Sequence, residues 1–380
     1  MSEDFTYMGN SLQCVKEYTY LGIPFTPSGL FNRARETMQQ KGQKAYYSMK
    51  SLVNIDNTDI PTMLHCFDAT VKPVLMYGSE VWGANLIKPH IKNCSLEQSY
   101  DNSYTSKVEL KFYKNLLQVR RNTSSIAVRG ELGRYPIDID ILESMLKFWV
   151  RGQRLEENCL VKKAFKENIA LHQSGVRCWT SAIYDLCDHL GITKHNLPKT
   201  LSMIKHKLQS KYQSYWKTQI TKEQGYTSGK NKLRTYRLFK NIFKIELYLI
   251  YIKNARNRAP LSKLRLSAHS LAIESLRGKV HDPTQRHCTI CQTQEVEDEQ
   301  HFFMKCDFYQ QERLNLLKSI HAKCKNFALL NNTDKFIWLL SNEDEDICRL
   351  VNQYVSTCFK KRSYKLNSET DKNKQNGSQL

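Results

Sequence analysis

The chain has 380 residues, 12 of them cysteine, and a formal net charge of +20 at pH 7. With 41% hydrophobic and 25% charged residues it has the composition of an ordinary soluble globular protein, and its length allows two or three domains. No apolar run approaches the roughly 18 residues of a membrane span, and the first residues lack the basic start and apolar stretch of a secretory signal. We therefore expect an intracellular protein, in the nucleus or the cytoplasm, with reduced cysteines and a polyanionic partner, first of all nucleic acid.

A small β element is predicted at the start of the chain. Its strands are expected at residues 5–8 and 18–25, where aromatic and β-branched residues are interrupted by glycine and asparagine and followed by Pro27 and Gly29. From Ser28 onward the apolar residues recur at helical spacing. The architecture is therefore predicted to be mainly α.

Helices are predicted over most of the remaining chain. The first runs from Ser28 to Leu52 and the second from Thr58 to about Met76, with Pro73 kinking or stopping it. Residues 85–106 lack a period and are rich in Asn, Ser and Tyr, which indicates a surface loop. Further helices are expected at residues 107–119, 139–155, 159–171, 177–190, 197–219 and 233–254.

Residues 221–231, which contain Gly225 and Gly229, are predicted to form a linker at a domain boundary. Positive charge is concentrated around this linker, because residues 201–280 carry 18 Lys and Arg but only three acidic residues. Five cations after the linker are candidate contacts to phosphate, with a solvated helix face as the alternative. They are Arg256, Arg258, Lys263, Arg265 and Arg277.

Two interactions of this basic segment are left open by the sequence. Arg265 could contact phosphate bidentately, or it could pair internally with Glu274. Aromatic residues interleaved with the charges could stack on unpaired bases, but the i, i+4 spacing of Phe239 and Phe243 favours packing in a core.

A Cys-x2-Cys…His-x4-Cys series is the most specific motif of the chain. Cys288 and Cys291 precede His301 and Cys306, with nine residues between the two halves. The first pair can form a tight knuckle that points both sulfurs at one metal, and the second pair completes a tetrahedral Cys3His set. Because no position is left for water, we predict a structural Zn²⁺. The alternatives are four unrelated residues, or His287 in place of His301.

The second half of this motif is predicted to be a short helix. Residues 297–305 begin with acidic side chains and end with a lysine, which suits the helix dipole. Positions five apart on a regular helix point about 140° away from each other, so Cys306 is expected where this helix ends. Asp307 is predicted to be the N-cap of the next helix, and residues 365–380 bury so little that we expect a disordered tail.

Six segments, taken in order, resemble the C-terminal part of reverse transcriptases from non-LTR retrotransposons of the jockey and LINE type. Each segment is short, but their order and the final Cys/His series cover most of the chain. They are residues 18–22 (YTYLG), 71–83 (VKPVLMYGSEVWG), 112–123 (FYKNLLQVRRNT), 130–136 (GELGRYP), 263–269 (KLRLSAH) with 273–274 (IE), and the series 288–306.

The resemblance implies an organisation into parts. Residues 1–26 would be the end of a palm-like β element, residues 27–120 a thumb-like helical region and residues 121–225 a helical C-terminal region. The ranges that follow are a basic helical segment (226–285), the Cys3His zinc module (286–325), C-terminal helices (326–364) and the tail (365–380).

The catalytic residues of that family are not found in this sequence. Its polymerases hold two metal ions with a Phe/Tyr-Ala-Asp-Asp box and another upstream carboxylate, and the chain has neither. Asp138, Asp140 and the acidic run 343–346 lack a flanking apolar strand, and we expect them to be solvated. We therefore predict no catalysis, and a truncated element copy or a gene model begun downstream of the catalytic core.

The predicted function is the binding of RNA or DNA by the basic helical segment and the zinc module. Two alternatives stay open. The chain could be the non-catalytic portion of an RNA-directed DNA polymerase that is active only with an upstream reverse transcriptase palm domain, or it could be an inert relic of an element.

Overall fold

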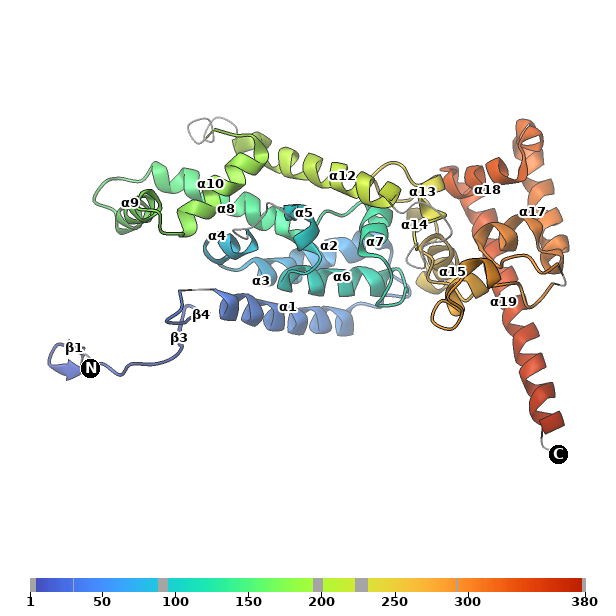
Figure 1. Cartoon of the computed structure of the whole chain (residues 1–380), viewed down its shortest axis with the longest axis horizontal. Helices are drawn as coiled ribbons and strands as arrows, with labels where there is room; N and C mark the ends of the chain where they lie inside the picture. Colours follow the sequence, from blue (N-terminus) through green and yellow to red (C-terminus); the bar gives the residue numbers. More distant parts are fainter. Residues whose placement is uncertain are drawn as a thin grey trace. The chain divides into compact units, whose positions relative to one another are not determined.

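In the computed structural model the chain is mainly α-helical, with a small β element near its N-terminus, as the sequence predicts (Figure 1). The structure describes residues 5–29, 31–87, 95–193, 201–222, 232–291 and 293–377. Among these residues, no helix is both long enough and apolar enough to cross a membrane.

Four short strands form two separate antiparallel pairs. Strand β1 (Thr6–Tyr7) pairs with β2 (Asn10–Ser11), and β3 (Tyr18–Tyr20) pairs with β4 (Ile23–Phe25). A glycine with positive φ lies in the turn of each pair, where a residue without Cβ reverses the chain at little cost. Most side chains of these strands are exposed, so the β element contributes little to a core.

The helices and 3₁₀ turns follow in chain order. Those before residue 200 are α1 (Asn32–Leu52), α2 (Ile60–Thr70), α3 (Lys72–Met76), α4 (Ser79–Trp82), η1 (Gly83–Leu86), α5 (Leu96–Tyr100), α6 (Tyr104–Leu116), α7 (Ser125–Leu132), α8 (Ile137–Gln153), α9 (Leu160–Gln173) and α10 (Trp179–Leu190). Those after it are η4 (Leu201–Met203), α12 (Ile204–Lys222), α13 (Tyr236–Phe239), α14 (Tyr248–Tyr251), α15 (Ala255–Arg265), α16 (Ala272–Ser275), η5 (Pro283–Gln285), the π turn η6 (His301–Lys305), η7 (Asp307–Tyr309), α17 (Gln310–Lys323), η8 (Lys325–Leu329), α18 (Asn332–Ser341) and α19 (Glu345–Gly377).

The chain forms two compact units, each assembled from discontinuous segments. The first unit contains residues 1–49, 67–109 and 136–210, and the second contains residues 50–66, 110–135 and 211–380. These units do not follow the linear ranges expected from the sequence, which remain predictions.

Helix α8 lies at the centre of the first unit and packs against α4, η1, α9 and α10 (Figure 1). Gly83 starts η1 so close to α8 that a Cβ there would lie 2.7 Å from the sulfur of Met145, which leaves no room for a side chain. Further along α8, Phe148 packs edge to face on Phe165 of α9 and Trp179 of α10, with ring centroids 5.3 Å and 5.9 Å away. Aromatic burial therefore joins these three helices.

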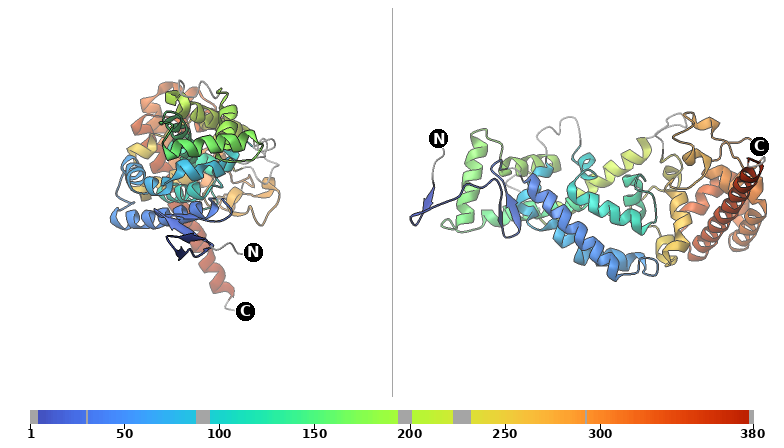
Figure 2. Two further views of the ribbon diagram at one scale, coloured as in Figure 1. Left: turned by 90° about the vertical axis from the view of Figure 1, so that its left-hand side faces the viewer. Right: turned by 90° about the horizontal axis from the view of Figure 1, so that it is seen from below.

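The long helix α19 organises the second unit. It packs against α14, α15, α17 and α18, and Figures 1 and 2 show the orange-red α17 alongside the red α19. Phe302 stacks on Phe359 of α19 with ring centroids 4.7 Å apart, and Phe303 lies 4.8 Å from Tyr354. The segment that carries the Cys/His series is therefore built into the core of this unit.

The single helix predicted for residues 233–254 is wrong. Only α13 and α14 are helical here, and irregular chain joins them. In this chain Ile245 forms a β-bridge with Leu132, and the backbone NH of Glu246 donates to the carbonyl of Glu131 at 3.0 Å. Hydrogen bonds to a distant segment thus replace the helical ones that local spacing favours.

Two further expectations concern residues 58–106. The predicted break at Pro73 is confirmed, because α2 ends at Thr70 and the proline lies in the first turn of α3. The surface loop predicted for 85–106 is wrong in its second half, which forms α5 and the start of α6. Ser95 begins α5 as an N-cap whose side chain accepts a hydrogen bond from the backbone of Gln98 at 3.4 Å, and residues 88–94 lie outside the described residues.

The C-terminal expectations also change. The tail predicted to be disordered is helical as far as Gly377, where α19 ends, and residues 378–380 lie outside the described residues. Each added residue contributes one more hydrogen bond to a helix already nucleated by its packed half. Asp307 is not the N-cap of α17, since a 3₁₀ turn intervenes and α17 begins at Gln310. Of the predicted linker, α12 includes the residues up to Lys222, and residues 223–231 lie outside the described ones.

Candidate metal centre and basic surface

The four side chains that the motif predicts as metal ligands come together in the second unit. The sulfurs of Cys288, Cys291 and Cys306 and a ring nitrogen of His301 all lie within 4.8 Å of one another. Three of these residues are buried and Cys291 is half-buried. The group could hold one metal ion, and the exposed His287 is not a member of it.

The first two ligands are presented by a tight hairpin-like turn. The backbone of Cys288 donates to the carbonyl of Glu295 at 2.8 Å, and that of Glu297 donates to the carbonyl of Arg286 at 3.0 Å, which pairs the two arms. Arg286 is buried, and its guanidinium donates to three carbonyls of the preceding segment at 2.8 to 3.2 Å. The turn that carries Cys288 and Cys291 is therefore fixed by the backbone on both sides.

The other two ligands reach the same point through the π turn η6. On a regular helix His301 and Cys306 would point about 140° away from each other. In the structure the backbone NH of Cys306 donates to the carbonyl of His301 at 2.8 Å, which is the i→i+5 bond of a π turn. The helix ends before Cys306 as expected, but its widened last turn is what brings both side chains to one side.

The imidazole of His301 is oriented through both ring nitrogens. Nε2 lies 3.3 Å from the sulfur of Cys291, and Nδ1 lies 3.0 Å from the carboxylate of Glu295. Burial opposes charge on the ring, but hydrogen bonds with Cys288 and Glu295 outweigh it and raise the pKa of His301 to about 9. A hydrogen bond from Cys306 is the main cause that lowers the pKa of Cys288 to about 3. A carboxylate that contacts one ring nitrogen and leaves the other facing the cysteine sulfurs is the arrangement that orients metal-ligating histidines.

A buried ion pair joins this module to α19. The carboxylate of Glu297 accepts hydrogen bonds from Arg362 at 3.1 and 2.6 Å and from the backbone of Ala272 at 2.6 Å. Burial raises the pKa of Glu297, and the arginine opposes that effect. The same carboxylate lies 3.7 Å from the sulfur of Cys288, so the metal centre and the long helix share one polar network.

Two of the five predicted phosphate contacts are wrong, because Arg258 and Arg265 are buried. Arg258 donates to the backbone carbonyls of Ile252, Lys253 and Leu116. Arg265 is only 2% exposed and is held by the carboxylates of Glu131 and Glu246. Glu274, the alternative partner that the sequence left open for Arg265, instead pairs with Arg234 and Arg277. Neither Arg258 nor Arg265 is available to a phosphate in this fold.

The other three predicted contacts are more accessible than these two arginines. Arg256 is exposed and pairs with Asp56 at 2.8 Å, and Lys263 is half-buried. Arg277 is half-buried and pairs with Glu274 at 2.6 Å.

Near Arg277 lie two further cations from distant segments. Burial lowers the pKa of Lys232, and the positive charges of Arg277 and Arg120 lower it further, while Glu274 offsets part of this effect. The side chain of Lys232 also donates to the carbonyl of Asn122 at 3.2 Å. Positive charges from three segments are therefore close enough to act on one another here, with Glu274 offsetting part of them.

The clearest basic surface lies on α12, which was not among the candidate binding residues predicted from the sequence. This 19-residue helix has no acidic residue. Lys211, Lys217 and Lys222 are exposed, and their side chains make no ion pair or hydrogen bond with any described residue. Lys211 and Lys222 are eleven residues apart and so project within about 20° of each other along one face. The absence of carboxylates over 19 residues was the sequence signal that could have identified this face.

The acidic residues that we expected to be solvated differ in their exposure. The run 343–346 is exposed as predicted, but Asp138 is fully buried and accepts a hydrogen bond from Ser103 at 3.1 Å. Asp140 is largely buried between Lys72 and Lys205, at 2.6 and 2.7 Å. The two aspartates are therefore structural groups of the first unit.

Aromatic residues of the basic segment pack in the core, as their spacing favours: Tyr236 and Phe239 are buried, and Phe243 contacts Trp216 with ring centroids 5.3 Å apart.

No known protein family, curated protein or solved structure matches this chain.

Proposed function

We propose that this chain binds RNA or DNA with little sequence selectivity, and that a structural Zn²⁺ in the Cys3His group stabilises the unit that carries the binding surface. The observation that carries the proposal is α12, a 19-residue helix on which the exposed Lys211, Lys217 and Lys222 have no carboxylate partner among the described residues. Phosphates are the anions that such a lysine stripe suits, because each neutralised phosphate releases counterions and adds affinity independent of sequence. The accumulation of Arg120, Lys232 and Arg277 supports the same conclusion.

Zinc is the metal that this donor set favours. Three thiolates and one imidazole suit Zn²⁺ rather than Mg²⁺ or Ca²⁺, which prefer oxygen ligands. The four ligands leave no position for a substrate or for water, so the role is structural. Binding requires the thiols to be deprotonated and should therefore release protons.

The nucleic-acid proposal is tested by the salt dependence of binding. A single-stranded RNA of about 20 nucleotides is titrated with the wild-type chain and with the double variant Lys211→Gln/Lys222→Gln. If both lysines contact phosphate, the slope of log K against log salt should become shallower by about 1.4, at about 0.7 for each lost contact. The matched control is Lys318→Gln/Lys325→Gln, which removes two exposed lysines of the same unit outside α12. Equal slopes in both variants would show that α12 is not the binding surface.

The zinc proposal is tested on the full chain by metal analysis and circular dichroism. We expect one zinc per chain and a loss of helical signal with a chelator, because the module lies in the core of the second unit. Cys291→Ser should remove most of the affinity, whereas Cys324→Ser, a half-buried thiol outside the group, should not. Glu295→Ala should weaken metal binding by about 10- to 100-fold, since it removes the group that orients His301. A preparation without stoichiometric zinc would contradict the proposal.

We also propose that the chain corresponds to the C-terminal part of a non-LTR retrotransposon reverse transcriptase. The order of the six sequence segments supports this proposal. A second support is that the four residues of the final Cys/His series lie together in one group. A second candidate function follows, in which the chain is the non-catalytic portion of an RNA-directed DNA polymerase that requires an upstream palm domain. In a primer-extension assay with Mg²⁺ we expect no synthesis by this chain alone, because it lacks the carboxylate box. Synthesis above background would overturn the binding-only proposal.

A further inference from the structure

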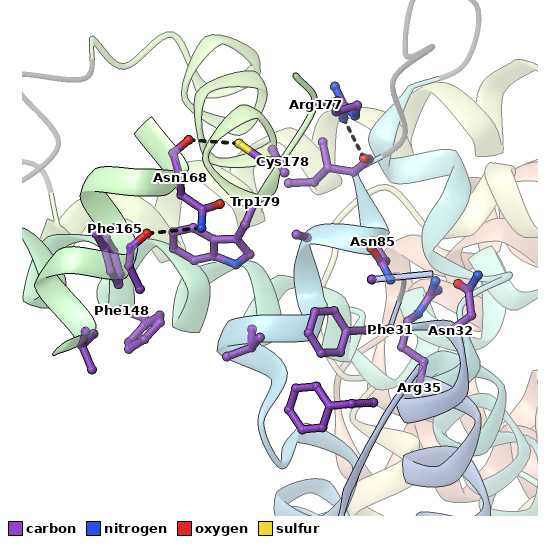
Figure 3. A pocket seen from close by; sticks show the side chains of 18 of the residues that line it. Phe31, Asn32, Arg35, Asn85, Phe148, Phe165, Asn168, Arg177, Cys178 and Trp179 are labelled. Atoms are coloured by element: carbon purple, nitrogen blue, oxygen red, sulfur yellow. Dashed lines mark hydrogen bonds between the residues drawn. The ribbon is translucent and has the colours of Figure 1, made fainter. Parts of the chain in front are cut away.

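The first unit contains a large cavity that the proposed function does not use. Its volume is about 1300 Å³, and its walls come from β4, the first turn of α1 and the connection between them, and from α4, η1, α8, α9 and α10. Figure 3 shows Phe148, Phe165 and Trp179 on one side of it and Phe31 on the other. At its edge Leu160 is 81% exposed, so an apolar rim faces solvent. A cavity of this size lined by aromatic rings is typical of a site for a small organic ligand.

One end of the cavity is lined by polar side chains, and one of these has a buried hydrogen-bond donor without an acceptor. Figure 3 shows Asn32, Arg35 and Asn85 close together beside Phe31. The side-chain Nδ2 of Asn85 is buried and has no hydrogen-bond partner. An unsatisfied buried amide donor costs free energy that an acceptor on a ligand would recover.

Arg35 adds a positive charge at the same end. Its guanidinium lies over the ring of Tyr104, 5.2 Å from the centroid, and burial lowers its pKa. Asp138 attracts it electrostatically but does not form a salt bridge with it. A desolvated arginine that lacks a paired carboxylate favours an anionic ligand, because the anion would supply the missing charge and acceptors.

The other polar groups of the wall already have partners. Arg177 donates to Asp185 at 2.9 Å and to the carbonyl of Ile87 at 3.2 Å. The thiol of Cys178 donates to the carbonyl of Asn168 at 3.1 Å (Figure 3). A ligand that accepts hydrogen bonds would therefore find its donors at the end formed by Arg35 and Asn85.

We propose that this cavity binds a small organic anion with an aromatic or otherwise apolar body, whose acidic group lies against Arg35 and Asn85. The aromatic walls take the apolar body, and the donor end takes the carboxylate or sulfonate. The site is independent of the nucleic-acid surface on α12 and of the metal centre. Its failure would therefore leave those proposals untouched.

Two probes with the same aromatic body test the charge requirement. The anion 8-anilino-1-naphthalenesulfonate and the uncharged N-phenyl-1-naphthylamine are titrated into the full chain, with fluorescence as the readout. We expect one saturable site for the anion, with an affinity at least about tenfold higher than that of the neutral probe. Equal affinities for the two probes would overturn the proposal.

Variants locate the site. Arg35→Met should weaken the binding of the anion by about tenfold and leave the affinity for the neutral probe unchanged. The control is Arg154→Met, which replaces an exposed arginine outside the cavity wall and should change neither affinity. Ala164→Trp should fill part of the cavity and weaken both probes. If Arg35→Met does not fold, as judged by circular dichroism, Asn85→Leu takes its place with the same expectation. Anion binding that survives both Ala164→Trp and the donor-end variant would show that the cavity is not the site.

Discussion

The replacement Arg265→Met should destabilise the second unit rather than weaken nucleic-acid binding. In the structure the Nε of this buried guanidinium donates to Glu131 at 2.5 Å, and Nη2 donates to Glu131 at 3.3 Å and to Glu246 at 2.6 Å. The guanidinium also lies over the rings of Phe239 and Tyr248, 4.6 and 5.2 Å from their centroids. Removing it would leave the carboxylate of Glu131, which is 0% exposed, without its countercharge.

The size of the effect follows from this burial. Breaking a buried ion pair by removing one partner costs about 3–5 kcal/mol, because the other charge stays desolvated. For a unit of this size each kcal/mol lowers the melting temperature by about 2–4 °C, so the loss should be on the order of 10 °C. The control is Arg256→Met, whose pair with Asp56 has side-chain exposures of 79% and 31% and should be worth at most about 1 kcal/mol.

The assay is urea and thermal unfolding at pH 7 with zinc present, together with RNA binding at several salt concentrations. Adding Glu131→Gln to Arg265→Met should recover part of the lost stability, because the stranded charge is removed. The reasoning would be refuted if Arg265→Met kept wild-type stability and instead made the salt dependence of RNA binding shallower. That result would mean that the guanidinium faces solvent and phosphate.

Two further predictions concern other parts of the fold. Gly133 has φ +60°, and a Cβ there would lie 2.5 Å from the backbone nitrogen of Ile245, so Gly133→Ala should cost about 1–3 kcal/mol in urea unfolding. Gly175→Ala, also at positive φ but with open space around the added Cβ, should cost less, and equal losses would exclude a role for close packing. Burial raises the pKa of Asp140, but Lys72 and Lys205 outweigh it and lower that pKa overall. Its contribution to stability is therefore present above the unfolded value of about 4 and is lost as the pH falls through the lower folded pKa. Between about pH 5 and pH 2 the wild type should lose more stability than Asp140→Asn, and parallel losses would contradict this.

Local patterns in the sequence were sufficient for several features. The spacing of Cys288, Cys291, His301 and Cys306 predicts that they form one group, because a metal centre of this kind is encoded by nearby residues on short turns. The β element and the break at Pro73 follow from glycine and proline, whose backbone preferences act locally. Helices such as α1 and α8 follow from apolar residues at a period of about 3.6.

Only the tertiary structure decides where a charged side chain ends up. The basic segment has the composition of a phosphate-binding surface. In the structure, however, Arg258 and Arg265 point into the second unit, where Arg258 donates to the carbonyl of Leu116 and Arg265 pairs with the carboxylate of Glu131. Hydrogen bonds to the distant Glu131 replace helical ones in the helix expected at 233–254, and the π turn that aligns His301 with Cys306 packs through Phe302 on Phe359 of α19. A local pattern reports the period and the charge of a segment. Which of its polar groups are desolvated depends on partners more than a hundred residues away, such as Glu131 for Arg265, and no local pattern contains them.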